Sequence, residues 1–175
     1  PPPRMIPMSG FFSGTATGSG LHDDHQSTLK ALGALEVVLT PRKPPVFDEQ
    51  IRAVLGETAR VLEEDVTLHF AFEETHLFPR IAASGSCGMV EILRSEHDDI
   101  RPMAIDLRAR ILGVLEAGVI GEAAWQDLRL RAGELIAREV FHIQKEEMGL
   151  LAALAQVLDD SDDQALVALR GAARG

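Results

Sequence analysis

The stretch His69-Phe70-Ala71-Phe72-Glu73-Glu74 decides the fold, because the chain contains a second copy, His142-Ile143-Gln144-Lys145-Glu146-Glu147. Each copy has a glutamate four residues after its histidine, and a second glutamate directly follows. On an α-helix, residues four apart lie about 40° apart around the axis and about 6 Å apart along it. A histidine and a carboxylate with this spacing can therefore reach one metal ion from one helix face.

Apolar residues recur at intervals of three and four around both copies, which predicts long amphipathic helices with one buried stripe each. Ala, Leu, Glu and Arg dominate the composition and tyrosine is absent, which favours helix over sheet. We expect Pro79 to kink or end the second helix and Pro102 to kink the third. Four long helices with short connections predict an all-α, up-down-up-down four-helix bundle. The expected ranges are 21–40, 48–79, 89–117 and 122–158, followed by a short helix that Ser161 caps and that ends near Arg170.

The buried stripes carry polar residues that repeat along the chain at an almost constant offset. His25 and His97 are 72 residues apart, and His69 and His142 are 73 apart. The chain therefore looks like one helical hairpin used twice, and packing the two around a pseudo-twofold axis would gather the stripe residues at the bundle centre. Such a set could hold two metal ions, with two histidines per ion and both carboxylates bridging. The candidate ligands are His25, His69, Glu73, His97, His142 and Glu146.

The chemistry of this set favours particular metals. Imidazole and carboxylate together suit iron, manganese or zinc, and no thiolate is present to favour softer ions. Four imidazoles and two carboxylates exceed the needs of one tetrahedral zinc site. Taken singly, a histidine on an apolar stripe is usually an ordinary core residue, and a histidine–glutamate pair is usually an ordinary helix pair. Their combination on four inward stripes indicates a metal site.

The sequence resembles the hemerythrin-like, or HHE cation-binding, family over residues 21–158. The resemblance implies a four-helix bundle with a non-heme, oxo- or hydroxo-bridged di-iron centre, in which manganese or zinc could replace iron. It also implies that the four stripe histidines are terminal ligands and that Glu73 and Glu146 are the bridging carboxylates. The residues that carry the resemblance are Asp24-His25, His69-x-x-x-Glu73-Glu74 with Leu77-Phe78-Pro79, Glu96-His97 and His142-x-x-x-Glu146-Glu147.

The chain departs from the oxygen-carrying members that it resembles. Those proteins have a fifth histidine one turn after the third-helix histidine, where this chain has Arg101, and an aspartate as the last bridge, where it has Glu146. The set of four histidines and two glutamates is closer to proteins implicated in iron–sulfur cluster repair and the nitric oxide response. Those commonly carry a cysteine-bearing N-terminal segment, whereas the single cysteine here, Cys87, lies in a predicted loop and is expected to be incidental.

Several functions follow from the resemblance. The leading expectation is a metal-binding protein that takes O₂, NO or a peroxide for sensing, scavenging or the handling of iron and oxidants. The alternatives are a peroxidase- or oxygenase-like di-iron enzyme, an iron donor in iron–sulfur cluster repair, and a helical bundle without a metal.

Two further histidines and three further glutamates lie near the candidate ligands. His22 and His76 are weaker candidates for extra ligands, because their repeat counterparts are Arg94 and Gly149. Glu139 precedes a stripe histidine by three residues, and either hydrogen-bonds a ligand imidazole or lies at the wet edge of the bundle. The remaining two, Glu74 and Glu147, point about 100° away from the bridging residues, so we expect them at helix interfaces or in solvent.

Composition and charge exclude several other classes of protein. The formal net charge is −10, which makes a nucleic-acid backbone an unfavourable partner. No apolar run reaches the roughly 18 residues that a membrane span needs. Residues 1–20 predict a flexible lead-in without the order of a signal peptide, and the lone cysteine excludes an internal disulfide, so we expect a cytoplasmic protein. The acidic residues in 159–175 predict a solvated C-terminal tail around the short helix.

Overall fold

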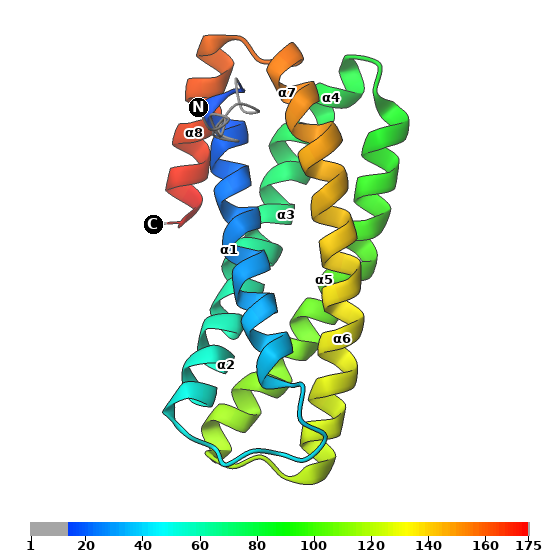
Figure 1. Ribbon diagram of the computed structural model, residues 1–175. Helices are drawn as coiled ribbons and strands as arrows, with labels where there is room; N and C mark the ends of the chain where they lie inside the picture. Colours follow the sequence, from blue (N-terminus) through cyan, green and yellow to red (C-terminus); the bar gives the residue numbers. More distant parts are fainter. Residues whose placement is uncertain (1–13, 175) are drawn as a thin grey trace, which may run out of the picture.

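The structure is a computed structural model that describes residues 14–174, so most of the predicted lead-in lies outside the described residues. Four long helical segments in this part run alternately up and down, and a shorter fifth helix packs beside the first (Figure 1). No strand occurs in residues 14–174, so the predicted all-α bundle with a short C-terminal helix is confirmed. The segments are α1 (Ala16–Val38); α2 (Glu49–Val61), η1 (Leu62–Leu68), α3 (His69–Phe72), η2 (Glu73–Leu77) and α4 (Phe78–Ala83); α5 (Cys87–Ala117); α6 (Glu122–Lys145), η3 (Glu146–Leu150) and α7 (Leu151–Val157); and α8 (Asp160–Arg174).

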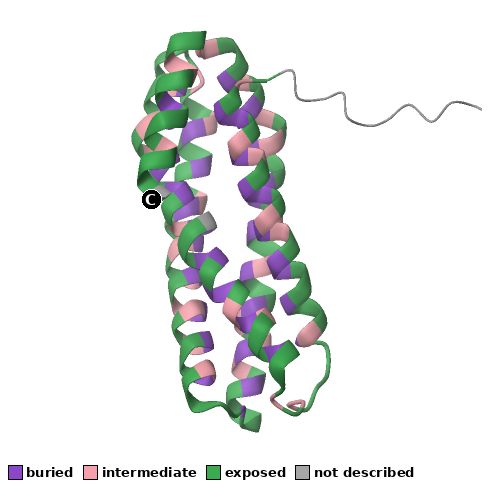
Figure 2. Ribbon diagram, turned by 90° about the vertical axis from the view of Figure 1, so that its left-hand side faces the viewer, coloured by how far each residue is buried: buried purple, intermediate pink, exposed green. Residues whose placement is uncertain are grey.

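The predicted stripes form the interior of the bundle. The residues that recur every three or four positions, such as Leu55, Leu107 and Leu135, are buried, and Figure 2 shows the buried positions facing inward. The apolar residues form two clusters, one around Trp125 and Leu107 and another around Phe78. The stripe histidines and glutamates come between these two clusters along the helices, so apolar packing encloses them from both ends.

The first helix begins five residues earlier than the sequence predicts, at Ala16 rather than Leu21. Thr15 caps it, since its hydroxyl oxygen accepts a hydrogen bond of 2.9 Å from the backbone N–H of Gly18. The carboxylate of Asp163 in α8 also accepts from the N–H groups of Ala16 and Thr17, at 2.7 and 2.8 Å. The prediction of a purely solvated acidic tail is therefore wrong for Asp163, which stabilises the positive end of a helix remote in sequence.

The last helix also begins differently from the prediction. Asp159, not Ser161, caps α8, because its side chain accepts a hydrogen bond of 2.8 Å from the backbone N–H of Asp162. The helix then continues beyond the predicted end to Arg174. Its Leu166 is fully buried in the apolar cluster around Phe78, so α8 is part of the packed structure.

The second segment passes through Pro79 and continues to Ala83, so the proline does not end it. A widened π-helical turn, η2, ends at Leu77, and Pro79 then lies in the first turn of α4. The missing N–H of a proline is tolerated in the first turn of a helix, where N–H groups lack a partner within the helix. The π-helical turn therefore makes room for Pro79.

Trp125 ties the first inter-helix connection to the bundle, and replacing it with phenylalanine tests this link. Its side chain is fully buried, and Nε1 donates a hydrogen bond of 2.9 Å to the carbonyl oxygen of Pro41. We expect Trp125→Phe to lower the free energy of unfolding by about 1–2 kcal/mol through the lost hydrogen bond and the reduced packing. Urea unfolding measures this, with Val119→Ala at an exposed position as the control; equal midpoints for both variants would contradict the link.

No helix in residues 14–174 combines the length and the apolar character needed to cross a membrane.

Candidate metal centre

The structure brings the six predicted ligand residues together in two overlapping groups of donor atoms. One group contains His25 and His69 with both glutamates, and the other contains His97 and His142 with the same glutamates. Within each group the donor atoms lie within 4.8 Å of one another, and every residue is buried. Glu73 and Glu146 belong to both groups, as bridging residues would.

The carboxylate of Glu146 lies at the centre of the four imidazoles. Its Oε2 is 3.0 Å from Nε2 of His25 and 3.8 Å from Nε2 of His69. Its Oε1 is 3.0 Å from Nε2 of His142 and 3.5 Å from Nε2 of His97. Each oxygen therefore faces one pair of histidines.

Glu73 shows the same division between the two histidine pairs. Its Oε1 lies 3.2 Å from Nε2 of His69, and its Oε2 lies 3.4 Å from Nε2 of His97. Within each pair the Nε2 atoms are close, at 3.3 Å between His25 and His69 and 3.1 Å between His97 and His142. The site is therefore two half-sites that share both carboxylates.

The unsatisfied atoms of the site fit a pair of cations. None of the four oxygens of Glu73 and Glu146 has a hydrogen bond of normal geometry among the described residues, although imidazole nitrogens lie nearby. A buried carboxylate without partners is costly, and so are two nitrogens that face each other at about 3 Å. A cation in each half-site would take the lone pairs of two nitrogens and two oxygens, a donor set that suits iron, manganese or zinc.

The outer nitrogen of every candidate histidine is held by a carboxylate. Because a carboxylate only accepts hydrogen bonds, each Nδ1 is the protonated donor, and the lone pair of a neutral imidazole is then on the inward Nε2. This arrangement prepares four nitrogens for metal binding. The contacts are His25 to Glu147 at 2.5 Å, His69 to Asp24 at 3.2 Å, His97 to Glu74 at 2.8 Å and His142 to Glu96 at 2.9 Å.

Glu74 and Glu147 lie at helix interfaces, which is one of the two expected positions, and each contacts a candidate ligand of a neighbouring helix. The repeat itself contains the signal that identifies them, since each follows the inward glutamate in its copy of the motif. Each of the four outer carboxylates also contacts a cationic or basic side chain further out. These pairs are Asp24 with Arg170, Glu96 with Lys145, Glu74 with Arg101 and Glu147 with His22.

The two extra histidines lie outside both groups of donor atoms. His22 is partly exposed, and its Nδ1 lies 2.9 Å from Oε2 of Glu147. His76 is half-buried beside Phe72, with the ring centroids 5.1 Å apart. Arg101, at the position of the fifth histidine in oxygen carriers, lies 2.6 Å from Glu74.

Glu139 is buried at 2% exposure, so the alternative that placed it at the wet edge is wrong. Its Oε2 has no hydrogen-bond partner among the described residues. Burial raises the pKa of Glu139.

In the metal-free site, the buried carboxylates raise the pKa values of the candidate histidines. Burial lowers the pKa of His142, but the Glu146 carboxylate outweighs this effect and raises the pKa to about 9. Burial raises the pKa of Glu146, but His142 and its neighbours hold it well below the usual value. Asp24 has a pKa of about 2, since hydrogen bonds from His69 and Arg170 outweigh its burial. The inward carboxylate of Glu146 is therefore ionised and ready to bind a cation.

The backbone widens where the inward glutamates lie. Glu73 begins the π-helical turn η2 and Glu146 begins η3, so the two copies of the motif share this local geometry. Such turns inside α-helices are often found at functional sites.

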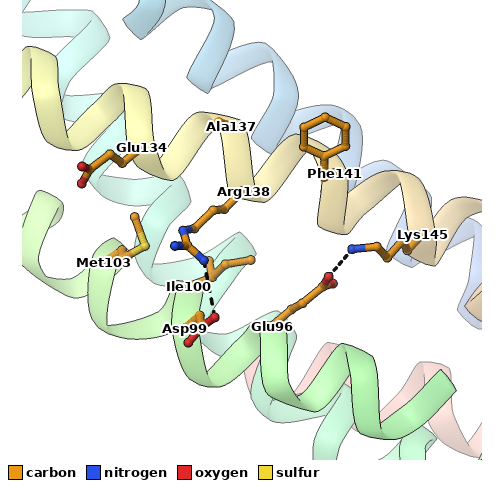
Figure 3. Close-up of a pocket in the computed structure, with 9 residues that line it drawn as sticks. All are labelled: Glu96, Asp99, Ile100, Met103, Glu134, Ala137, Arg138, Phe141 and Lys145. Carbon is orange, nitrogen blue, oxygen red and sulfur yellow. Dashed lines mark hydrogen bonds and ion pairs between the residues drawn. The ribbon is translucent and has the colours of Figure 1, made fainter. Parts of the chain in front are cut away.

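A groove between α5 and α6 reaches the outer edge of the site. It has a volume of about 710 Å³ and is lined by residues that include Met103, Phe141 and Glu96. Figure 3 shows Glu96 paired with Lys145 across this groove. The other oxygen of Glu96 accepts from His142, so one carboxylate joins the groove to a candidate ligand.

Comparison with known proteins agrees with the geometry. The family model described as the hemerythrin HHE cation-binding domain matches residues 19–154, while no curated protein matches the chain. The matched range includes all six inward residues and their four outer carboxylates. Domains of this type bind metal cations, and the two groups of histidine and glutamate provide suitable donors. The chain belongs to the hemerythrin HHE cation-binding domain family.

Proposed function

We propose that the protein is a non-heme di-iron protein that binds O₂, NO or a peroxide for sensing, scavenging or the handling of iron and oxidants. His25 and His69 hold one ion as terminal ligands, and His97 and His142 hold the other. The two inward glutamates bridge the ions. The predicted division of the chain, with the bundle at 21–158 flanked by a lead-in and a tail, is part of this proposal.

The observation that supports the proposal is the position of Glu146. One of its oxygens faces each histidine pair, with nearest Nε2 distances of 3.0 Å on both sides. Glu73 faces the same two pairs from across the site. A carboxylate shared between two imidazole pairs is the arrangement that a bridged pair of ions requires, and a mononuclear site would leave one pair unused.

When bound, a ferrous pair supplies two electrons to a small oxidant. The residues of the chain contribute the rest. The four outer carboxylates orient the imidazoles, the two apolar clusters exclude water from both ends, and two anionic bridges compensate the changing charge of the ions. The single cysteine, Cys87, is free, which is compatible with a reducing cytoplasm as the setting.

A second candidate is a di-iron enzyme of the peroxidase or oxygenase type. The groove between α5 and α6 favours it, because it is large enough for an organic molecule and its wall contains Glu96. Glu96 accepts a hydrogen bond from His142, so a molecule in the groove would lie beside the carboxylate that holds this candidate ligand.

Elemental analysis of the purified protein tests the metal content, and anaerobic reduction followed by O₂ or NO tests ligand binding. Two iron ions per chain and new charge-transfer absorption bands would support the proposal. One ion or none per chain after reconstitution with ferrous iron would contradict it. Substrate turnover that requires the groove would favour the enzyme, and transfer of iron to an apo cluster protein would favour an iron donor.

The outer carboxylates provide a further prediction. We expect Glu96→Gln to weaken iron binding about 10- to 100-fold, because the neutral amide is a poorer acceptor for the Nδ1–H of His142. Competition with a chelator measures the affinity. Asp99→Asn is the matched control, since Asp99 lines the same groove and forms an exposed ion pair with Arg138. Equal affinities for the two variants would contradict the orienting role of Glu96.

A further inference from the structure

The internal repeat breaks at one position beside the site. Glu139 precedes His142 by one helical turn, and the corresponding residue before His69 is Val66. Both side chains are buried, with exposed fractions of 2% for Glu139 and 0% for Val66. The same place in the two halves of the bundle therefore carries a carboxyl group in one half and an aliphatic group in the other.

A second break in the repeat lies on a neighbouring helix. One turn after His25, α1 carries the buried Thr28, whereas one turn after His97 the corresponding residue in α5 is Ile100. α1 and α6 are in contact along the bundle (Figure 1). Thr28 and Glu139 thus lie on adjacent helices, so the surroundings of the candidate ligands are polar towards α1 and α6 and apolar towards η1 and α5.

One carboxyl oxygen of Glu139, Oε2, is buried without a partner among the described residues. Burial of an unpaired carboxyl oxygen is destabilising. The strongest electrostatic influences on it after burial come from His142, Glu146, His69 and His25. The unpaired Oε2 is available to a bound molecule, and burial, which raises the pKa of Glu139, favours the protonated form that donates a hydrogen bond.

Glu139 also stands outside the ligand set itself. It belongs to neither group of donor atoms within 4.8 Å of one another, although it lies one helical turn before His142. A polar group that is adjacent to a metal site but outside its ligand set, and that has an unpaired oxygen, can hydrogen-bond a ligand of the metal rather than the metal.

We propose that Glu139 hydrogen-bonds the small ligand held at the metal centre and selects ligands that accept a hydrogen bond strongly, such as hydrogen peroxide or azide, over NO. This inference rests on the proposed di-iron function. The ligand lies on the side of the site that faces α1 and α6, and Val66 leaves the opposite side without a polar group.

Azide and NO serve as probe ligands of the metal centre. The internal repeat suggests the substitution, because Val66 is the counterpart of Glu139. Glu139→Val gives this half the residue that the other half has at Val66, and Glu139→Gln keeps a hydrogen-bond donor of similar size. Glu134→Val, at an exposed position of the same helix, is the matched control. Iron content is measured first for each protein. Azide affinity of the ferric protein and NO affinity of the ferrous protein are then measured by absorbance titration.

We expect all variants to bind wild-type amounts of iron. Azide affinity falls at least about tenfold in Glu139→Val, which corresponds to the loss of one good hydrogen bond, and stays within about threefold in Glu139→Gln. NO affinity stays within about threefold in every variant. Unchanged azide affinity in Glu139→Val, or an equal loss for azide and NO, would overturn the inference.

A measurement without metal separates a functional role of Glu139 from a structural one. Removing a buried, unpaired carboxyl group should raise the melting temperature of the metal-free Glu139→Val protein by about 2–4 °C or more. A lower melting temperature in that form would show that Glu139 supports the fold, and would overturn the inference. If the wild-type protein does not bind two iron ions, the proposed function is overturned as well. If Glu139→Val has normal iron content and unchanged azide affinity, only this inference is overturned.

Discussion

Glu146→Ala is expected to abolish the binding of both metal ions, so that iron content falls to background. The Glu146 carboxylate lies between 3.0 and 3.8 Å from all four inward Nε2 atoms, and no other described side chain contacts every imidazole of the site. Its removal takes one ligand from each ion and leaves a single anion, Glu73, among four imidazoles. Elemental analysis after reconstitution with ferrous iron measures the result.

Two further variants sharpen this test. Glu146→Gln keeps the size and one oxygen donor, so we expect it to retain more iron than the alanine variant. Glu91→Ala, at an exposed position of α5, should keep the full content. Far-UV circular dichroism of the metal-free proteins checks that the helices remain. Wild-type iron content in a folded Glu146→Ala protein would contradict the bridging role.

The bundle and its six inward residues could be predicted from the sequence, because one periodicity governs both. His69 and Glu73 continue the apolar stripe of their helix without a change of register, so the packing that buries Val66 and Leu77 also buries them. The constant offset between the two copies then specified which helices must meet. Burial and symmetry together were enough to place the candidate ligands at one centre.

The outer carboxylates could not be placed by the same reasoning. A single helix indicates only that Glu74 and Glu147 point about 100° away from the stripe, and it does not decide whether a neighbouring helix or solvent lies in that direction. In the bundle, His97 and His25 present their Nδ1 atoms there. Asp163 was missed for the same reason, since the N–H groups that it caps are about 146 residues away in the sequence. Contacts between helices decide these roles.

Removal of the metal is expected to lower the melting temperature by about 10 °C at pH 8. A metal that binds only the folded chain at about 1,000 times its dissociation constant stabilises it by about 4 kcal/mol. For a chain of 175 residues each kcal/mol shifts the melting temperature by about 2–4 °C. Differential scanning calorimetry of metal-free and reconstituted protein measures the difference.

The decrease in melting temperature that follows metal removal should become larger as the pH rises from 6 to 9. In the metal-free site the pKa of His142 is about 9, above its ordinary value of 6.5, because the Glu146 carboxylate outweighs the effect of burial. A raised histidine pKa contributes stability that is fully present below pH 6.5 and is lost as the pH rises through the folded value. A proton on His142 thus replaces part of the metal charge at pH 6, and it leaves as the pH rises through about 9.

The ionisation of Glu146 sets the lower limit of the pH range in which the metal-free protein is most stable. Glu146 has a pKa well below 4.5 in the folded chain, so its contribution is present above pH 4.5 and is lost as the pH falls through the folded value. The metal-free protein should therefore melt highest between about pH 4.5 and 6.5, while the metal-loaded protein, whose imidazoles carry no extra protons, keeps its stability to higher pH. Melting curves of both forms at pH 6, 7, 8 and 9 give the difference directly. A difference that stays constant or narrows towards pH 9 would show that protons do not replace the cations among these imidazoles.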